Sequence, residues 1–284
     1  MMLPTPKLNQ LFVTISPIPG GQITLPEQYF VHPADKTARH TVPSLSFLIT
    51  HPGSTNSPPR RVLFDLGLRS SLTSYSEPQQ HHLLNRKPYT LGPGVASLLR
   101  SGGIDPADID TIILSHVHYD HHGDPSHFPG AHGASHQHFS ADLLPSVRTL
   151  ELPPIGESTA EYQWESLGPF DSIDIFGDGS IFVLNSPGHL PGHINLLCRL
   201  SAERWVCLCG DAYHDRRLLT GERSIAFWTG RGGAVCCIHQ DPDAARKALG
   251  QLRELGRMGN VEMIGAHDKG WLEENKARIW PGCL

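Results

Sequence analysis

A run of six residues, H-V-H-Y-D-H, places four potential metal ligands directly after a predicted buried strand. The ligands are His116, His118, Asp120 and His121, and the strand is the largely apolar segment at residues 110–115. Imidazole nitrogens and carboxylate oxygens suit zinc and its first-row neighbours. Side chains this close in sequence reach one ion only from an irregular loop, because regular structure spreads them over different faces. The segment therefore predicts a metal site at the carboxyl end of a strand.

Three further strand ends carry a His or an Asp after a turn that contains glycine. Taken singly, each would be an ordinary turn residue. Four such strand ends in one chain are better explained by convergence on one site. At Gly188, glycine frees the backbone for the sharp turn that aims the next histidine. The strands and their polar residues are 182–186 with His189, 205–209 with Asp211, and 261–264 with His267.

The order of the predicted elements indicates one α/β domain built from two similar halves. The chain has 284 residues, with no internal repeat and no clear linker. A short helix is expected at residues 95–100, and the clearest helix begins at Asp241, an N-cap residue followed by proline. Residues 70–92 and 140–170 are expected to be insertions, the second of loop and helix. Strands are expected at residues 11–15, 44–50, 61–64, 110–115, 180–185, 193–200, 204–209 and 260–265.

The charge balance argues against nucleic acid as a partner. Twenty-three Lys and Arg against 28 Asp and Glu give a net charge of −5, whereas phosphate recognition needs a basic surface. No apolar run approaches the roughly 20 residues of a membrane-spanning helix, and no secretory signal is recognisable. The six cysteines include no C-x-x-C pair, as expected for thiols in a reducing compartment. We therefore expect a cytoplasmic protein that acts on a small molecule, and oligomeric state cannot be inferred.

Four motifs resemble those of the metallo-β-lactamase superfamily, in the same order along the chain. They are H-V-H-Y-D-H, S-P-G-H-L-P-G-H, C-G-D-A and G-A-H-D. Within that superfamily the chain is most similar to the N-acyl homoserine lactonase branch, through the second motif, the fourth motif and a closing R-I-W-P segment. The resemblance spans nearly the whole chain. It implies a single domain over residues 1–284 with a four-layer αβ/βα sandwich fold and a dinuclear metal site at one edge.

The same resemblance implies which residues hold metal. Two zinc ions per chain are expected, with iron or manganese as alternatives, and Asp211 would bridge the two ions. His193 binds neither ion in that scheme. We expect its side chain to pack against its neighbours or to support a metal ligand. The remaining ligands would be His116, His118 and His189 for one ion, and Asp120, His121 and His267 for the other.

The resemblance also suggests a mechanism. Two adjacent cations lower the pKa of water, so a metal-bridging hydroxide would attack the substrate carbonyl. Asp120 would orient that hydroxide, and Tyr213 or His214 would donate to the carbonyl or to the leaving group. The lactonase branch has a Tyr three residues after its bridging Asp, where this chain has His214. Near neutral pH an imidazole protonates a nitrogen leaving group more readily than a phenol, which favours a lactam or cyclic carbamate.

We therefore expect a metal-dependent hydrolase that opens a lactone or lactam, in the degradation of a secondary metabolite or a xenobiotic. The G-x-S-x-G and P-loop motifs of rival hydrolases are absent. Two alternatives stay open: an open-chain ester or thioester hydrolase of the acyl-carrier thioesterase type, and a non-hydrolytic di-iron redox protein on the same fold. The thioesterase would need residues 70–92, 140–170 and 212–240 to form an open groove rather than a closed cup.

Overall fold

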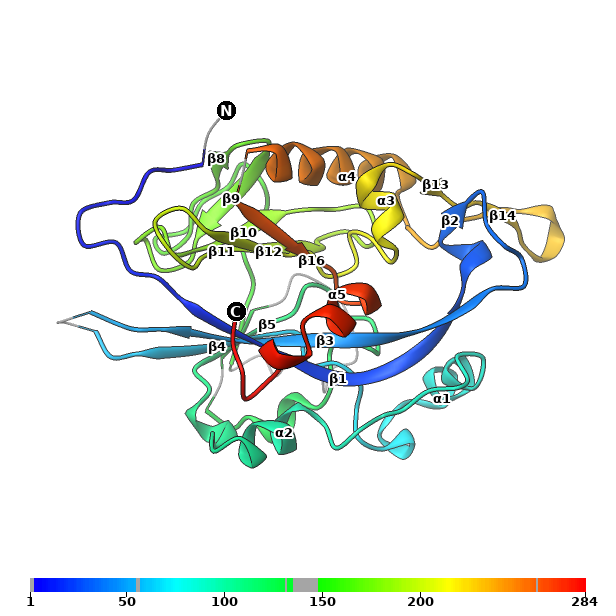
Figure 1. Cartoon of the computed structure of the whole chain (residues 1–284), viewed down its shortest axis with the longest axis horizontal. Helices are drawn as coiled ribbons and strands as arrows, with labels where there is room; N and C mark the ends of the chain where they lie inside the picture. Colours follow the sequence, from blue (N-terminus) through cyan, green and yellow to red (C-terminus); the bar gives the residue numbers. More distant parts are fainter. Residues whose placement is uncertain (1–2, 55–56, 131, 135–147, 259) are drawn as a thin grey trace.

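Two six-stranded sheets pack face to face and carry helices on their outer faces in the computed structural model of the chain (Figure 1). The arrangement is the four-layer α/β sandwich that the sequence predicts. The structure describes residues 3–54, 57–130, 132–134, 148–258 and 260–284.

The first sheet is antiparallel at one edge and parallel at the other. Its first two pairings are antiparallel, and the remaining three are parallel. In spatial order it contains β1 (Thr14–Pro26), β3 (Arg39–His51), β4 (Arg60–Phe64), β5 (Thr111–Ile113), β6 (His132–Ala134) and β7 (Thr149–Leu150).

The second sheet is mainly antiparallel. One pair of strands at its edge is parallel, and the other four pairs are antiparallel. Two small two-stranded sheets lie outside the sandwich. In spatial order the second sheet contains β16 (Val261–Ile264), β12 (Trp205–Leu208), β11 (Ile194–Arg199), β10 (Ile181–Asn185), β9 (Phe170–Asp174) and β8 (Glu165–Leu167). The small sheets pair β2 (Val31–His32) with β13 (Ser224–Ile225), and β14 (Trp228–Thr229) with β15 (Val235–Cys236).

Helices cover both outer faces of the sandwich, whereas the last helix, at residues 269–274, packs Trp271 into the cluster between the sheets. In Figure 1, α4 lies along the outer face of the second sheet and α2 below the first. The Asp241 side chain accepts hydrogen bonds from two backbone N–H groups of the first turn of α4, which confirms it as the N-cap. The helices are α1 (Glu77–Leu84), α2 (Val95–Ser101), α3 (Arg216–Thr220), α4 (Pro242–Arg257) and α5 (Lys269–Glu274).

Alternation along the strands divides the core into layers. On β5, Ile113 packs between the two sheets, whereas Ile112 on the opposite face packs with the α2 side. On β11, Leu196 faces the space between the sheets and Leu197 joins the cluster under α4. Both faces of these strands are buried, so each strand ends where its run of apolar residues ends. The polar residues that follow then lie at the edge of the sandwich.

Two of the expected elements differ in the structure. The strand expected at residues 11–15 is β1, which runs on to Pro26 through Pro17 and Pro19. Its edge position explains this, since a proline on an edge strand removes no hydrogen bond that the sheet needs. The helix expected within residues 140–170 is wrong for the described part: residues 148–170 contain β7, β8 and turns, and residues 140–147 lie outside the described residues.

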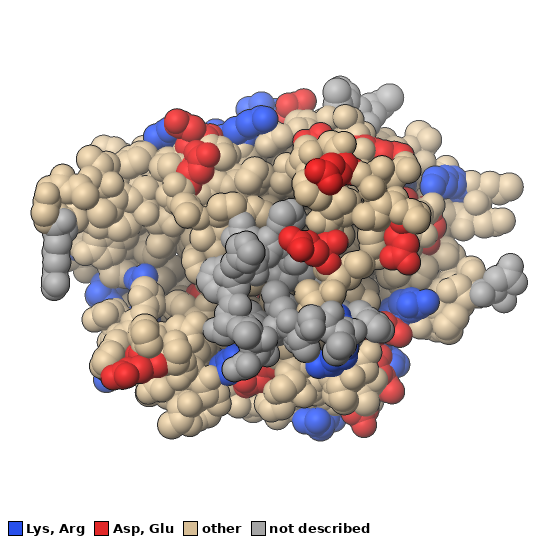
Figure 2. All heavy atoms as spheres, turned by 180° about the vertical axis from the view of Figure 1, so that it is seen from behind, with Lys and Arg blue, Asp and Glu red and all other residues tan. Residues whose placement is uncertain are grey.

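Charged side chains of both signs are spread over the surface drawn in Figure 2. Among the described residues, no helix combines the length and the apolar character required to cross a membrane.

Candidate metal centre

The polar residues that follow four strands meet at one edge of the sandwich. The parallel pair β12 and β16 delivers Asp211 and His267 to the same end, where the loop after β5 and the turn after β10 also arrive. Ligand atoms within each group come within 4.8 Å of one another. The groups are His116, His118, His189 and Asp211; Asp120, His121 and His267; and Asp211, His214 and His267.

Glycine makes two of the turns possible. Gly188 has a φ of +136°, and a Cβ there would lie 2.3 Å from the backbone nitrogen of Ala245 in α4. Gly210, just before Asp211, has a φ of +47°, and its Cβ would meet Ser115 at 2.7 Å. A side chain at either position would therefore clash and strain the backbone. The glycines let the chain turn beside its neighbours and present His189 and Asp211.

The first group has the spacing of metal ligands rather than of a hydrogen-bond network. His118 Nδ1 lies 2.9 Å from His116 Nε2 and 3.0 Å from His189 Nε2. Asp211 Oδ2 lies 3.6 Å from the first of these Nε2 atoms and 3.4 Å from the second. Ligands about 2.05 Å from a tetrahedral zinc ion are about 3.3 Å apart. The three nitrogens therefore fit one shared ion, since a single Nδ1 cannot satisfy two ring nitrogens with its one proton.

The second group leaves buried atoms without partners. His121 Nε2 and His267 Nε2 each lie 3.2 Å from Asp211 Oδ1, and His267 Nε2 lies 3.6 Å from Asp120 Oδ2. His121 Nε2 and Asp211 Oδ1 form no hydrogen bond within the described part of the chain. Unpaired buried polar atoms are costly unless a further group satisfies them. A divalent cation fits this donor set.

The electrostatics of the cluster also suit a cation. Burial and the neighbouring imidazoles hold the pKa of His116 well below its ordinary value, so its nitrogen lone pairs are free. Burial alone would raise the pKa of Asp211, but the charges of His121, His214 and His267 hold it well below the usual range. The first group thus presents neutral imidazoles at His116, His118 and His189 beside a buried carboxylate, and metal ligands need these protonation states.

Asp65, which the sequence analysis left without a site role, orients one of the histidines. Its Oδ2 accepts a hydrogen bond from His121 Nδ1 at 2.9 Å, and the backbone N–H and hydroxyl of Ser115 donate to its two oxygens at 2.7 and 2.8 Å. The charges of Asp211 and Asp65 raise the pKa of His121 despite its burial. Asp65 directly follows strand β4. The search for polar residues at strand ends, which identified the other site residues, could therefore have identified Asp65 as well.

Two further hydrogen bonds orient the cluster. His267 Nδ1 donates to the carbonyl of Pro43 at 2.7 Å, which leaves Nε2 to face the centre. His193 Nδ1 donates to the carbonyl of Ser186 at 3.1 Å, and its Nε2 accepts the backbone N–H of Asp211 at 3.0 Å. His193 therefore has no nitrogen left for a metal and supports the loop that carries Asp211, as expected from the sequence.

The structure separates the two candidate catalytic residues that follow Asp211. His214 lies beside the centre: its Nε2 is 3.1 Å from Asp211 Oδ2, and its ring stacks on His267. Tyr213 points the other way, into the apolar cluster under α4, where its hydroxyl has no partner among the described residues and its ring packs against Gly265. Of these two residues, only His214 reaches the cluster of candidate metal ligands.

His239 is a further buried histidine that the sequence analysis did not identify. It is 2% exposed, and neither ring nitrogen has a hydrogen-bond partner among the described residues. Its ring centre lies 5.3 Å from that of His189 and 5.7 Å from that of His214. Burial lowers its pKa to about 3, so it is neutral. No motif surrounds His239 in the sequence, and only the fold brings it to this centre.

Two adjoining cavities flank the centre, with volumes of about 390 and 340 Å³. Leu25, Phe30, His214 and His267 line both, so the cavities meet at these side chains. The larger one is walled by α1 from the insertion at residues 70–92 and by Ile238. Segments 70–92 and 212–240 thus contribute to the walls beside the centre, whereas no described residue of segment 140–170 lines either cavity.

Comparison with known proteins gives a family match over most of the chain. The model of the family described as "Metallo-beta-lactamase superfamily" matches residues 42–257. "Metallo-hydrolase mfmC" of Annulohypoxylon moriforme is 34% identical over 68% of this chain and 54% of that protein. "Gamma-lactamase FDB1" of Fusarium pseudograminearum is 31% identical over 60% of this chain and 45% of that protein. The chain spans only part of the length of these curated relatives: 54% of the metallo-hydrolase mfmC, and 32% of a longer relative.

A solved structure has the same fold. The crystal structure of a quorum-quenching N-acyl homoserine lactone lactonase matches with a TM-score of 0.67. The two chains are 18% identical, and the match covers 97% of this chain and 100% of the other. At that identity the likeness concerns the fold.

Proposed function

Because the chain belongs to the metallo-β-lactamase superfamily, we propose that it is a metal-dependent hydrolase that opens a cyclic ester or a cyclic amide. The convergence of eight His and Asp side chains beside two cavities is the observation that carries this proposal. A relative named as a γ-lactamase and a solved structure of a lactonase support the choice of ring substrates.

The residues at the four strand ends fit two divalent ions. Asp211 would contact both, because its two carboxylate oxygens face different histidines. When bound, the ions supply Lewis acidity that activates water as the nucleophile and polarises the substrate carbonyl. We propose zinc, with iron or manganese as alternatives. The other ligands would be His116, His118 and His189 for one ion, and Asp120, His121 and His267 for the second.

Asp120 would orient the attacking water. Its side chain lines the larger cavity, and its Oδ2 lies 3.6 Å from His267 Nε2. A carboxylate there accepts a hydrogen bond from the water and aims its lone pair toward the bound carbonyl.

His214 would contact the substrate. It lies where the two cavities meet, and Asp211 and the ring of His267 hold its orientation. An imidazole there can donate a hydrogen bond to the carbonyl oxygen or the leaving atom. Tyr213 shares this proposed role in the sequence, but its inward position makes it the weaker candidate. A histidine donor favours a nitrogen leaving group, hence a lactam or a cyclic carbamate.

The volumes and the largely apolar lining of the two cavities favour a small ring over a carrier-bound acyl chain. Apolar side chains of Ile23, Leu25, Phe30, Val117 and Ile238 face the larger cavity, with Gln79, His82 and Arg86 from the 70–92 segment. Volumes of about 340 and 390 Å³ suit a small organic molecule. The open-chain thioesterase remains the second candidate, because the same cluster of ligands would serve its chemistry.

A substrate screen on protein of measured metal content tests the proposal. We would compare a γ-lactone, a γ-lactam, a cyclic carbamate and an open-chain thioester that carry the same substituent. The proposal expects the ring substrates to be hydrolysed with higher kcat/KM than the thioester. Preference for the thioester would select the second candidate. A coloured di-iron protein without hydrolysis of any substrate would favour the redox alternative.

A further inference from the structure

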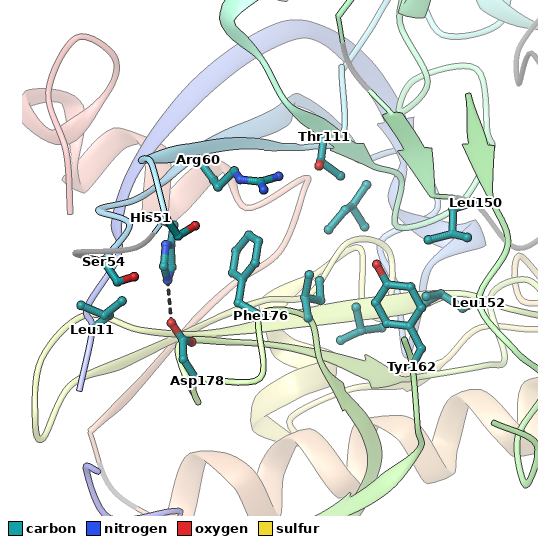
Figure 3. Close-up of a pocket in the computed structure, with 14 residues that line it drawn as sticks. Leu11, His51, Ser54, Arg60, Thr111, Leu150, Leu152, Tyr162, Phe176 and Asp178 are labelled. Atoms are coloured by element: carbon teal, nitrogen blue, oxygen red, sulfur yellow. Dashed lines mark hydrogen bonds and ion pairs between the residues drawn. The ribbon is translucent and has the colours of Figure 1, made fainter. Parts of the chain in front are cut away.

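A second region of the sandwich encloses a cavity of about 430 Å³ (Figure 3). It opens between the sheets where β5 begins, at Thr111, whereas His116 follows the other end of that strand. From Thr111 to Ser115 an extended chain covers about 13 Å. No residue that lines this cavity lines either cavity at the metal centre. It is therefore a separate site.

The walls of this cavity are mainly apolar. Ile113 and Val183 come from the facing strands β5 and β10, and Leu152, Ile175 and Phe176 come from the loops around them. Apolar walls give water few hydrogen-bond partners. A cavity of this size is in the range of small-molecule sites, roughly 300–1,000 Å³. Its walls suit the apolar body of such a molecule.

Three hydrogen-bond donors that have no partner among the described side chains face the same space. Arg60 forms no ion pair with a described acidic residue, and Figure 3 shows its guanidinium directed over the cavity. The hydroxyls of Thr111 and Tyr162 likewise have no hydrogen-bond partner in the described ranges. Burial raises the pKa of Tyr162, which keeps its hydroxyl a donor. Together these groups offer one positive charge and several donors.

The acidic residue in the wall is already paired. Asp178 accepts hydrogen bonds from His51 Nε2 at 2.7 Å and from the backbone N–H of Ser180 at 2.9 Å. His51 in turn accepts the backbone N–H of Gly53 on Nδ1, at 3.1 Å, so it has no free nitrogen for catalysis. The dashed contact between His51 and Asp178 closes one end of the cavity in Figure 3. The charge of Arg60 is left available.

We propose that this cavity binds a small organic monocarboxylate with an apolar body. The carboxylate would accept hydrogen bonds from Arg60, Thr111 and Tyr162, and a charge-assisted bond to guanidinium is the strongest of the three. The apolar body would pack between Ile113 and Phe176, where its transfer from water is favourable. The proposal does not depend on the reaction at the metal centre.

Calorimetric titration of the metal-loaded protein tests it, with octanoate and 2-naphthoate as probes. The matched neutral probes are octanamide and 2-naphthamide, which have nearly the same shape but no charge. Arg60→Gln is expected to weaken carboxylate binding roughly tenfold, and Tyr162→Phe by a smaller factor. The control is Arg61→Gln, because Arg61 is the next residue along β4 and is paired with Asp108 at 3.3 Å.

The outcomes separate this cavity from the metal centre. Saturable binding that prefers the carboxylates and is lost in Arg60→Gln but kept in Arg61→Gln supports the proposal. A crystal structure with 2-naphthoate should then show it beside Phe176. Equal binding of amide and carboxylate, no binding, or carboxylate binding unchanged by Arg60→Gln would overturn it. The last result would place the anion at the metal ions instead.

Discussion

The His121 imidazole donates its Nδ1–H to the Asp65 carboxylate, with 2.9 Å between Nδ1 and Oδ2. Because an ionised carboxylate only accepts hydrogen bonds, this contact makes Nδ1 the donor and turns Nε2 toward Asp211. Asp65 therefore sets the protonation and orientation of a candidate metal ligand without facing the cavity itself.

Replacing Asp65 should weaken metal binding while the fold survives. Asp65→Asn keeps the size of the side chain but loses the charge that holds the His121 proton on Nδ1. We expect metal affinity to fall about 10–100-fold, measured by competition with a chelator of known affinity. Asp171→Asn, on the exposed side of β9, is the matched control. Equal affinities in the two variants would remove Asp65 from the metal site.

Metal content is the most direct check on the proposed centre. Seven ligands in two groups that share Asp211 should hold two ions per chain. Chelation should abolish hydrolysis, and added zinc should restore it, because the ions supply the Lewis acidity. Removal should also lower the unfolding temperature, since binding free energy stabilises the folded chain. Elemental analysis that finds a single ion in fully active protein would contradict the dinuclear arrangement.

Asp120 should matter more for turnover than for folding. Asp120→Asn retains the volume of the side chain but removes the charge that orients water. We expect kcat to fall at least about 100-fold, with two-state unfolding preserved. Metal content must be measured on the same sample, since Asp120 is also a proposed ligand. Near wild-type turnover at full metal loading would exclude Asp120 from the reaction.

His214 and Tyr213 should behave differently although they are adjacent. His214→Ala should lower kcat roughly 10–1,000-fold at constant metal content, because it removes a hydrogen bond to the reacting group. Tyr213→Phe should change kcat little, since the hydroxyl has no partner among the described residues and lies in the apolar cluster. Rates on matched lactone and lactam rings show whether His214 serves the leaving nitrogen. If both variants keep full activity on every ring substrate, Tyr213 and His214 have only a structural role.

Glu27 should make the free energy of unfolding depend on pH in the acidic range. Burial alone would raise its pKa, but hydrogen bonds from His40 and Arg217 lower it from 4.5 to about 2. A lowered folded-state pKa stabilises the protein above the unfolded value, and this contribution disappears as pH falls from about 4.5 to about 2. Glu27→Gln should thus be less stable than wild type in chemical unfolding at pH 7, with a gap that narrows below pH 4.5. Glu77→Gln, at the exposed start of α1, should show no such gap.

Local patterns in the sequence were enough to locate the strand-end residues. The apolar runs of β5, β10, β12 and β16 end where polar residues follow, and backbone geometry places such residues at a sheet edge whatever the rest of the fold. The start of α4 was equally readable, since Asp241 and the proline after it act within one turn. The extent of β1 was not, because prolines are tolerated there only by its place at the edge of the sheet.

Strand patterns, strand-end polar residues and motifs shared with a known family thus determined the fold class and the set of candidate ligands. The tertiary structure alone decided which neighbours lie against them: Asp65 with His121, the Pro43 carbonyl with His267, and the His239 ring with His189. It also turned His214 toward the centre and Tyr213 into the core, although the two are consecutive. Ligand identity is local chemistry, whereas orientation, burial and pKa depend on atoms that only folding brings within a few ångströms.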